Sequence, residues 1–85
     1  MIAFSPIEED VLTAIGAEWC TVEELQKLFY PENSPEVVRR AVEYLKRKEL
    51  ITRIERQHGQ PLLEQTSVGF HALCVRRRAR VAVTP

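Results

Sequence analysis

The chain has 85 residues, which is enough for one hydrophobic core and too few for two, so we expect a single domain over residues 1–85. Its composition, 45% hydrophobic and 28% charged, is typical of a folded globular domain and excludes a largely disordered chain. No apolar run approaches the roughly 20 residues needed to cross a bilayer, and the first residues lack the pattern of a signal peptide. These features predict a cytoplasmic protein with no membrane segment.

The formal net charge is zero, but the charges are divided between the two halves of the chain. Residues 1–38 contain eight carboxylates and one lysine, whereas residues 39–85 contain eleven arginines and lysines and four carboxylates. This asymmetry predicts a polyanionic partner for the basic half. Pairing between the two halves of the molecule is the alternative explanation.

Residue patterns of catalysis and metal binding are missing from the sequence. It contains no glycine-rich phosphate loop, no nucleophile elbow and no His-Glu-x-x-His motif. Cys20 and Cys74 are far apart in the chain, and a zinc site would have to recruit His58 and His71 from unrelated segments. We therefore expect no enzymatic activity, no metal and no cofactor.

Two helices are predicted in the first third of the chain by their N-terminal capping signals. Ser5 precedes Pro6 and is followed three residues later by Glu8, which predicts a capping box at the start of the first helix. Thr21 and Glu24 have the same spacing and predict a second helix. This second helix should end near residue 30, because the proline that follows disfavours helical geometry.

The third helix is predicted over residues 34–48 and is strongly amphipathic. Its inner stripe should be formed by Val38, Ala41, Val42 and Leu45. The opposite side should present charged residues to solvent, namely Glu36, Arg39, Arg40, Glu43, Lys46 and Arg47.

From Leu50 onward the apolar residues alternate with polar ones, which predicts a strand instead of a helix. A turn at 58–61 and a second apolar segment at 62–65 complete a predicted β-hairpin over residues 50–65. Thr66 or Ser67 should cap a fourth helix that runs through the arginines at 76–78, and residues 81–85 should form a short strand or a frayed tail. A short extended segment is expected near Trp19.

This order of elements, with α+β and mainly α content, resembles a winged helix-turn-helix domain over nearly the whole chain. The segment Val37–Leu45 is similar to the third helix of that fold, and Leu45–Ile51 resembles its exit into the hairpin, the wing. Thr66-Ser67-Val68-Gly69-Phe70 resembles the Thr-x-x-Gly motif at the post-wing helix of PadR-like and MarR-like regulators. There are two departures: Glu49 stands where glycine is customary, and the turn between the second and third helices is long.

The resemblance implies a small regulator that binds double-stranded DNA, probing the major groove with helix 34–48 and the backbone or minor groove with the wing, residues 50–65. It implies a homodimer, with the fourth helix as the dimer surface. The implied contacts are Arg39, Arg40, Glu43, Lys46 and Arg47 from the helix, Arg53, Arg56, His58 and Gln60 from the wing, and secondary phosphate contacts from Arg76, Arg77 and Arg78.

Two alternatives to DNA binding remain open. The first is that the charged outer side of the third helix is only a solvated surface with no binding role. Its carboxylates Glu36 and Glu43 support this alternative, because phosphates would repel them. The second functional class is a winged-helix module that binds a protein, such as a phage accessory or inhibitor protein. The acidic first half favours that class, because an acidic surface can occupy a partner's nucleic-acid-binding site.

Overall fold

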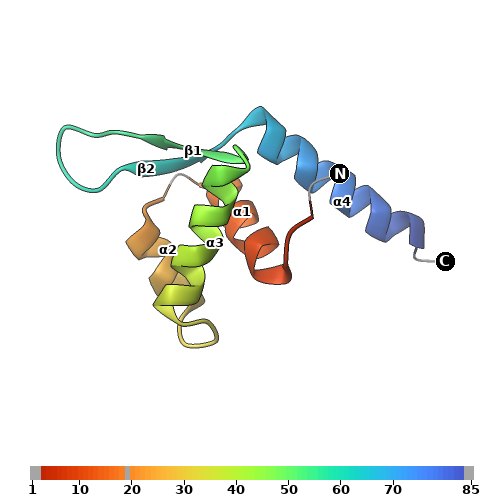
Figure 1. Cartoon of the computed structure of the whole chain (residues 1–85), viewed down its shortest axis with the longest axis horizontal. Helices are drawn as coiled ribbons and strands as arrows, with labels where there is room; N and C mark the ends of the chain where they lie inside the picture. The colour runs from red at the N-terminus through yellow and green to blue at the C-terminus, as the bar shows by residue number, and fades with distance from the viewer. Residues whose placement is uncertain (1–2, 19, 84–85) are drawn as a thin grey trace.

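The computed structural model describes residues 3–18 and 20–83, the last four as backbone only, and these form four helices and a two-stranded antiparallel sheet (Figure 1). The elements are α1 (Pro6–Ala17), α2 (Val22–Phe29), α3 (Pro35–Arg47), β1 (Ile51–Ile54), β2 (Leu62–Gln65) and α4 (Ser67–Val83). The element order and the mainly helical content confirm the predicted fold class.

The predicted capping signals at the start of α1 and α2 are confirmed. The Ser5 hydroxyl accepts a hydrogen bond from the Glu8 N–H, and the Glu8 carboxylate accepts one from the Ser5 N–H at 2.7 Å. Thr21 and Glu24 make the same reciprocal pair, at 3.0 and 3.1 Å. Two backbone donors that the helix itself cannot satisfy are thus satisfied in each first turn.

The hydrophobic core lies between α1, α2 and α3 and extends under the sheet. The predicted inner stripe of α3 is confirmed, since Val38, Val42 and Leu45 have no exposed surface and Ala41 is 2% exposed. Burial of each large side chain contributes roughly 1.5–3 kcal/mol, so this stripe holds α3 against the bundle. The other core residues are Phe4, Val11, Leu12, Ile15, Leu25, Leu50, Ile51, Leu63 and Leu73.

The hairpin is confirmed and its second strand has the predicted bounds, but the first strand is shorter and the loop longer than the sequence predicted. β1 pairs with β2 from Ile51↔Gln65 to Ile54↔Leu62, and residues 55–61 form the loop where a turn at 58–61 was expected. The side chains at 55–60 are exposed, so no core contact extends the ladder beyond Ile54. The extended segment near Trp19 is reduced to one bridge, in which the Leu63 N–H donates to the Cys20 carbonyl at 2.8 Å. Trp19 itself lies outside the described residues.

The exit from α3 explains how the helix ends without its customary glycine. The Leu50 N–H donates to the Leu45 carbonyl at 2.9 Å, and the Glu49 N–H to the Lys46 carbonyl at 3.0 Å. This pair of bonds is the Schellman motif, which needs a left-handed residue after the C-cap. Glu49 occupies that position with φ 60°, a conformation in which a side chain is strained.

The Thr-x-x-Gly segment begins α4, as predicted, and joins it to the end of α3. The Thr66 hydroxyl accepts from the Gly69 N–H at 3.0 Å, while the Thr66 N–H donates to the Leu50 carbonyl at 3.0 Å. A Cβ atom at position 69 would lie 2.1 Å from the Leu50 oxygen, so only glycine fits there. The helix continues to Val83, so the first alternative for the tail, a short strand, is wrong at 81–83, where the backbone extends the helix. The second alternative, a frayed tail, stays a prediction. Residues 84 and 85 lie outside the described residues.

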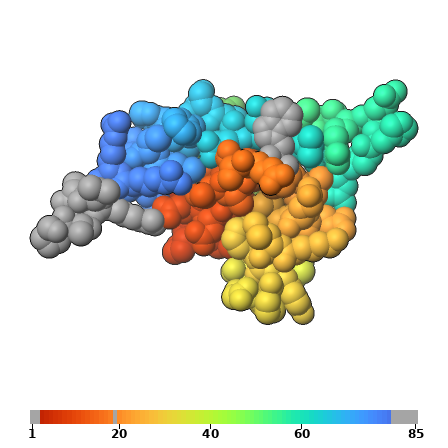
Figure 2. All heavy atoms as spheres, turned by 180° about the vertical axis from the view of Figure 1, so that it is seen from behind, coloured from red at the N-terminus to blue at the C-terminus, as the bar shows by residue number. Residues whose placement is uncertain are grey.

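The molecule is elongated, with extents of 48 × 29 × 20 Å, and the wing and α4 project from its two ends (Figure 1). Figure 2, seen from behind, shows α1 and α2 covering that face, with α3 largely hidden. Helix α1 therefore lies behind α3 in the view of Figure 1, whereas α2 lies beside α3. Across residues 3–18 and 20–83, no helix is both long and apolar enough to cross a membrane.

Candidate nucleic-acid interface

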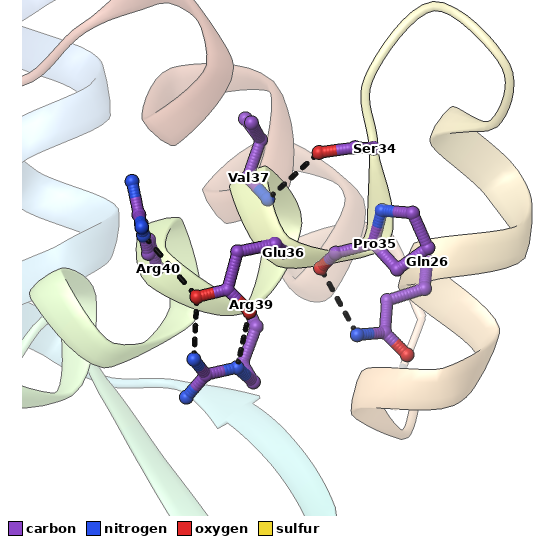
Figure 3. Close-up of polar contacts among 7 residues, drawn as sticks. All are labelled: Gln26, Ser34, Pro35, Glu36, Val37, Arg39 and Arg40. Atoms are coloured by element: carbon purple, nitrogen blue, oxygen red, sulfur yellow. Dashed lines mark hydrogen bonds and ion pairs between the residues drawn. The ribbon is translucent and has the colours of Figure 1, made fainter.

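The outer face of α3 carries more of the predicted DNA-contact residues than any other element. Ser34 caps the helix by accepting from the Val37 N–H at 3.3 Å, and the next residue, Pro35, takes the first helical position (Figure 3). The buried stripe on one side then forces the charged residues to the other. Arg39, Arg40 and Arg47 are exposed, and Lys46 is half-buried.

A cluster of three charged side chains lies at the start of this face (Figure 3). The Glu36 carboxylate accepts from Nε of Arg39 at 3.0 Å and from its Nη2 at 2.5 Å. It also accepts from Nε of Arg40 at 3.2 Å. The hydrogen bonds from Arg39, with its charge and that of Arg40, lower the pKa of Glu36, and the same bonds raise the pKa of Arg39. The carboxylate therefore stays ionised between two guanidinium groups.

The second half of the face is less constrained. Glu43 pairs with Lys46, with 2.9 Å between Oε1 and Nζ. Arg47 makes no ion pair with any residue that the structure describes. An exposed pair of this kind stabilises a helix by only about 0.3–0.5 kcal/mol, so this single-point contact constrains the Lys46 side chain little.

The wing carries its predicted residues in two settings. Arg53 lies on β1 and pairs with Glu55 at 2.7 Å, while His58 is exposed in the loop. Arg56 folds back across the loop, where its Nε donates to the Gln60 carbonyl at 2.8 Å, next to Gly59 with φ 87°. The loop is thus closed by a side chain instead of by further strand pairing.

Gln60 connects the wing to α2, a contact that no local pattern in the sequence indicated. Its Nε2 donates to Oε2 of Glu23 at 3.0 Å, and Glu23 also pairs with Lys27 at 3.3 Å. A second unpredicted contact holds the long turn between α2 and α3, where Nε2 of Gln26 donates to the Pro35 carbonyl at 3.0 Å (Figure 3). The wing and the start of α3 are therefore both tied to α2.

The three predicted phosphate-contacting arginines of α4 have different surroundings. Arg76 forms an ion pair with Glu9 of α1, and its guanidinium lies 4.8 Å from the centre of the Phe4 ring. Arg77 and Arg78 are exposed. Because α4 leads away from the wing, these arginines are not grouped with those of the hairpin (Figure 1). Their contact with DNA stays a prediction.

The residues described by the structure do not assemble a metal site. No three His, Cys, Asp or Glu side chains among them lie close enough together to hold an ion. Cys20 and Cys74 are free thiols. Burial, with the nearby charges of Glu24 and Glu18, raises the pKa of Cys20 to about 11.

Comparison with known proteins gives a structural likeness. No protein-family profile matches the chain, and no curated protein matches it. The crystal structure of a zinc-responsive MarR family member, ZitR of Lactococcus lactis, superposes with a TM-score of 0.74 at 20% sequence identity. The match covers 85% of this chain and 50% of that chain, so this chain spans about half the length of its structural neighbour. Together with the order of helices and hairpin, this likeness establishes that the chain has the winged helix-turn-helix fold found in a MarR family regulator.

Proposed function

We propose that this chain is a small transcriptional regulator that binds double-stranded DNA, with α3 in the major groove and the wing on the adjacent backbone or minor groove. The outer face of α3 carries the proposal: three exposed arginines, Arg39, Arg40 and Arg47, lie on a helix whose other side is buried. Arginine and lysine displace the counterions condensed on DNA, which provides essentially all of the free energy of non-specific binding. We place the protein in the cytoplasm and assign it no catalytic activity.

The wing supports the proposal by adding Arg53 and Arg56 beside the helix. Their guanidinium groups bond to Glu55 and to the Gln60 carbonyl, and both side chains are largely exposed. Phosphate oxygens can compete for donors held by such exposed contacts. The acidic helix α1 lies on the other side of the molecule from α3 (Figure 2), so it would orient the basic face toward the DNA, whereas Glu23 of α2 bonds to Gln60 of the wing.

The test is binding of a fluorescent 20-base-pair random duplex, measured by anisotropy between 50 and 200 mM salt. The affinity should fall steeply with salt, with a log–log slope of about 0.9 for each phosphate contacted. The double reversal Arg39→Glu with Arg40→Glu should abolish binding. The matched control, Arg77→Glu with Arg78→Glu, changes the net charge equally on α4 and should weaken binding only a few-fold. No retention of any duplex at 50 mM salt would refute the proposal.

We infer a homodimer that uses α4. Val68 is 49% exposed, although it is large and apolar. A groove of about 410 Å³ runs along the same helix, and its lining is mostly apolar, with one histidine and one arginine: Ala3, Val68, His71, Ala72, Val75, Arg76 and Ala79. Sedimentation equilibrium should show a dimer that Val68→Glu dissociates. A monomer at micromolar concentration would exclude this arrangement.

A protein-binding module, for instance a phage-encoded inhibitor, is the second candidate, and the acidic side of the molecule favours it. Asp10, Glu23 and Glu24 are exposed on α1 and α2. In that case a purified partner should be released by Glu23→Gln with Glu24→Gln, and Arg39→Glu with Arg40→Glu should have no effect. Duplex binding that competes with the partner would instead favour the regulator.

A further inference from the structure

In the first turn of α3, one carboxylate binds two arginines. Glu36 lies three residues before Arg39 and four before Arg40, so all three side chains share one face of the helix. The two contacts differ in kind. Arg39 is bound through two nitrogens, Nε and Nη2, whereas Arg40 is bound through Nε alone and is 76% exposed.

The two-point contact leaves a defined part of the Arg39 guanidinium unoccupied. The carboxylate takes the edge formed by Nε and Nη2. The third nitrogen, Nη1, points away from Glu36 (Figure 3). Since a guanidinium is planar and each Nη carries two hydrogens, the edge formed by Nη1 and Nη2 still offers two parallel N–H donors. Arg39 is therefore held with its end edge free.

The two parallel N–H donors of Arg39 can distinguish guanine from the other bases by the pattern of acceptors in the major groove. In the major groove guanine presents two adjacent acceptors, N7 and O6, which match the free edge of Arg39. Adenine presents the N7 acceptor beside an N6 donor, and a second donor would be repelled there. Arg40, which is held at one point only, keeps most of its donors for a phosphate.

Glu36 also changes the balance between specific and non-specific binding. A long side chain loses rotamer freedom when it binds to a base. Because the ionised Glu36 carboxylate already orients Arg39 in the free protein, Arg39 loses less rotamer freedom when it binds. The same carboxylate is repelled by phosphates, which weakens binding to any sequence. Both effects increase the ratio of specific to non-specific affinity.

We propose that Glu36 is a positioning residue that holds Arg39 end-on, so that α3 selects a guanine in the major groove. This inference rests on the proposed DNA binding. It assigns the base class that the helix reads and gives a role to a carboxylate that otherwise opposes contact with DNA.

The experiment uses the full chain and a 20-base-pair duplex recovered from a random library. Each guanine of that duplex is replaced in turn by 7-deazaguanine, which lacks the N7 acceptor. For the wild-type chain, one replacement should lower the affinity about tenfold, the order expected for a bidentate base contact. For Glu36→Gln the same replacement should lower it less than threefold, and a scrambled duplex should be bound a few-fold more tightly.

The matched control is Glu43→Gln, which removes a carboxylate from the same face that pairs with Lys46 and not with Arg39. It should gain affinity for the scrambled duplex and keep the full response to 7-deazaguanine. Arg39→Lys, which keeps the charge but not the paired donors, should lose that response. Urea unfolding of each variant should match the wild type, because all these side chains are exposed.

The outcomes separate this inference from the proposed function. If the wild type binds duplexes with steep salt dependence but no guanine N7 matters, the inference is overturned and DNA binding stands. The same holds if Glu36→Gln and Glu43→Gln respond alike to 7-deazaguanine. If no duplex is bound at low salt, both are overturned.

Discussion

The side-chain hydroxyl of Thr66 donates a hydrogen bond to the main-chain carbonyl of Glu49 at 2.7 Å, and so joins the start of α4 to the end of α3. The same hydroxyl accepts from the Gly69 N–H and thereby caps α4. One oxygen atom thus connects the element that presents the candidate interface with the element that we propose for dimerisation. The wing leaves and returns at this junction, so its direction depends on these bonds.

Replacement of Thr66 by valine should lower the free energy of unfolding by about 1–2 kcal/mol, because it removes both a helix cap and a hydrogen bond to a carbonyl. Urea unfolding followed by circular dichroism measures the change. Thr66→Ser keeps the hydroxyl and should stay within roughly 0.5 kcal/mol of the wild type. Equal stability of the two variants would show that the hydroxyl has no such role.

Replacement of Glu49 by glycine should stabilise the protein by about 0.5–1 kcal/mol. Its φ of 60° strains any residue with a Cβ, and glycine relieves this strain at some cost in unfolded-state entropy. Glu49→Ala removes the carboxylate but keeps the Cβ, and it should unfold at nearly the wild-type urea concentration. The explanation from backbone strain is wrong if alanine stabilises as much as glycine does.

Gly69→Ala should destabilise the protein by about 1–3 kcal/mol, because the new methyl group would meet the Leu50 carbonyl and the backbone must shift. Gly16→Ala is the matched control within α1. There the methyl group would meet the end of the Gln65 side chain, which can move. The loss of the Gln65 hydrogen bond to the Leu12 carbonyl should roughly offset the gain in helix propensity. Thermal unfolding of the two variants should therefore differ clearly, and similar melting temperatures would contradict the proposed clash.

Arg76→Gln should lower the free energy of unfolding by about 1–3 kcal/mol, between the values for exposed and buried ion pairs. The reason is that Glu9 is nearly buried, with its side chain 10% exposed, and Arg76 bridges it to the Phe4 ring. The neighbouring Arg77 is exposed, and Arg77→Gln should change stability by less than roughly 0.5 kcal/mol. If the two variants have the same free energy of unfolding, Arg76 does not hold α4 to α1.

The pKa of the Cys20 thiol should be measurable in a Cys74→Ser background by the ultraviolet absorbance of the thiolate. Burial and the charges of Glu24 and Glu18 raise it from 9.0 to about 11, so the folded chain holds this proton more tightly than the unfolded chain. The contribution of Cys20 to stability is therefore complete below pH 9 and decreases as the pH rises toward 11. A native titration midpoint near 9, equal to that in urea, would contradict the burial of this thiol.

The local features of the fold could be predicted because their causes lie within a few residues of one another. Capping boxes join residues three apart, and the buried stripe of α3 follows from the helical period alone. The absent glycine was visible at Glu49, and the structure explains it by a left-handed residue in a Schellman motif. The end of the first strand and the possible strand at 81–83 were predicted wrongly, because strand pairing near an exposed loop and the length of a terminal helix have weak local signals.

The candidate site was predictable only in part. The residues of the α3 outer face followed from periodicity, and the spacing of Glu36 to Arg39 and Arg40 already permits the cluster that the structure contains. At the sequence level this carboxylate counted against DNA binding, because the direction of its hydrogen bonds was not known. The sequence spacing shows that Glu36 can reach both arginines. Only the structure shows which N–H donors of Arg39 remain free once the contact is made.

The sequence by itself determined the helices, the change to a two-residue period at the wing, and the charged face of α3, because each arises from contacts along one element. Only the tertiary structure decided that Gln60 bonds to Glu23, that Arg76 pairs with Glu9, and that the Tyr44 hydroxyl donates to the Ala3 carbonyl. These partners are remote in the chain and meet because burial of the shared core brings α1, α2, α4 and the wing together. Hydrophobic packing is not directional, so the polar contacts that it allows follow from the whole assembly and not from any single segment.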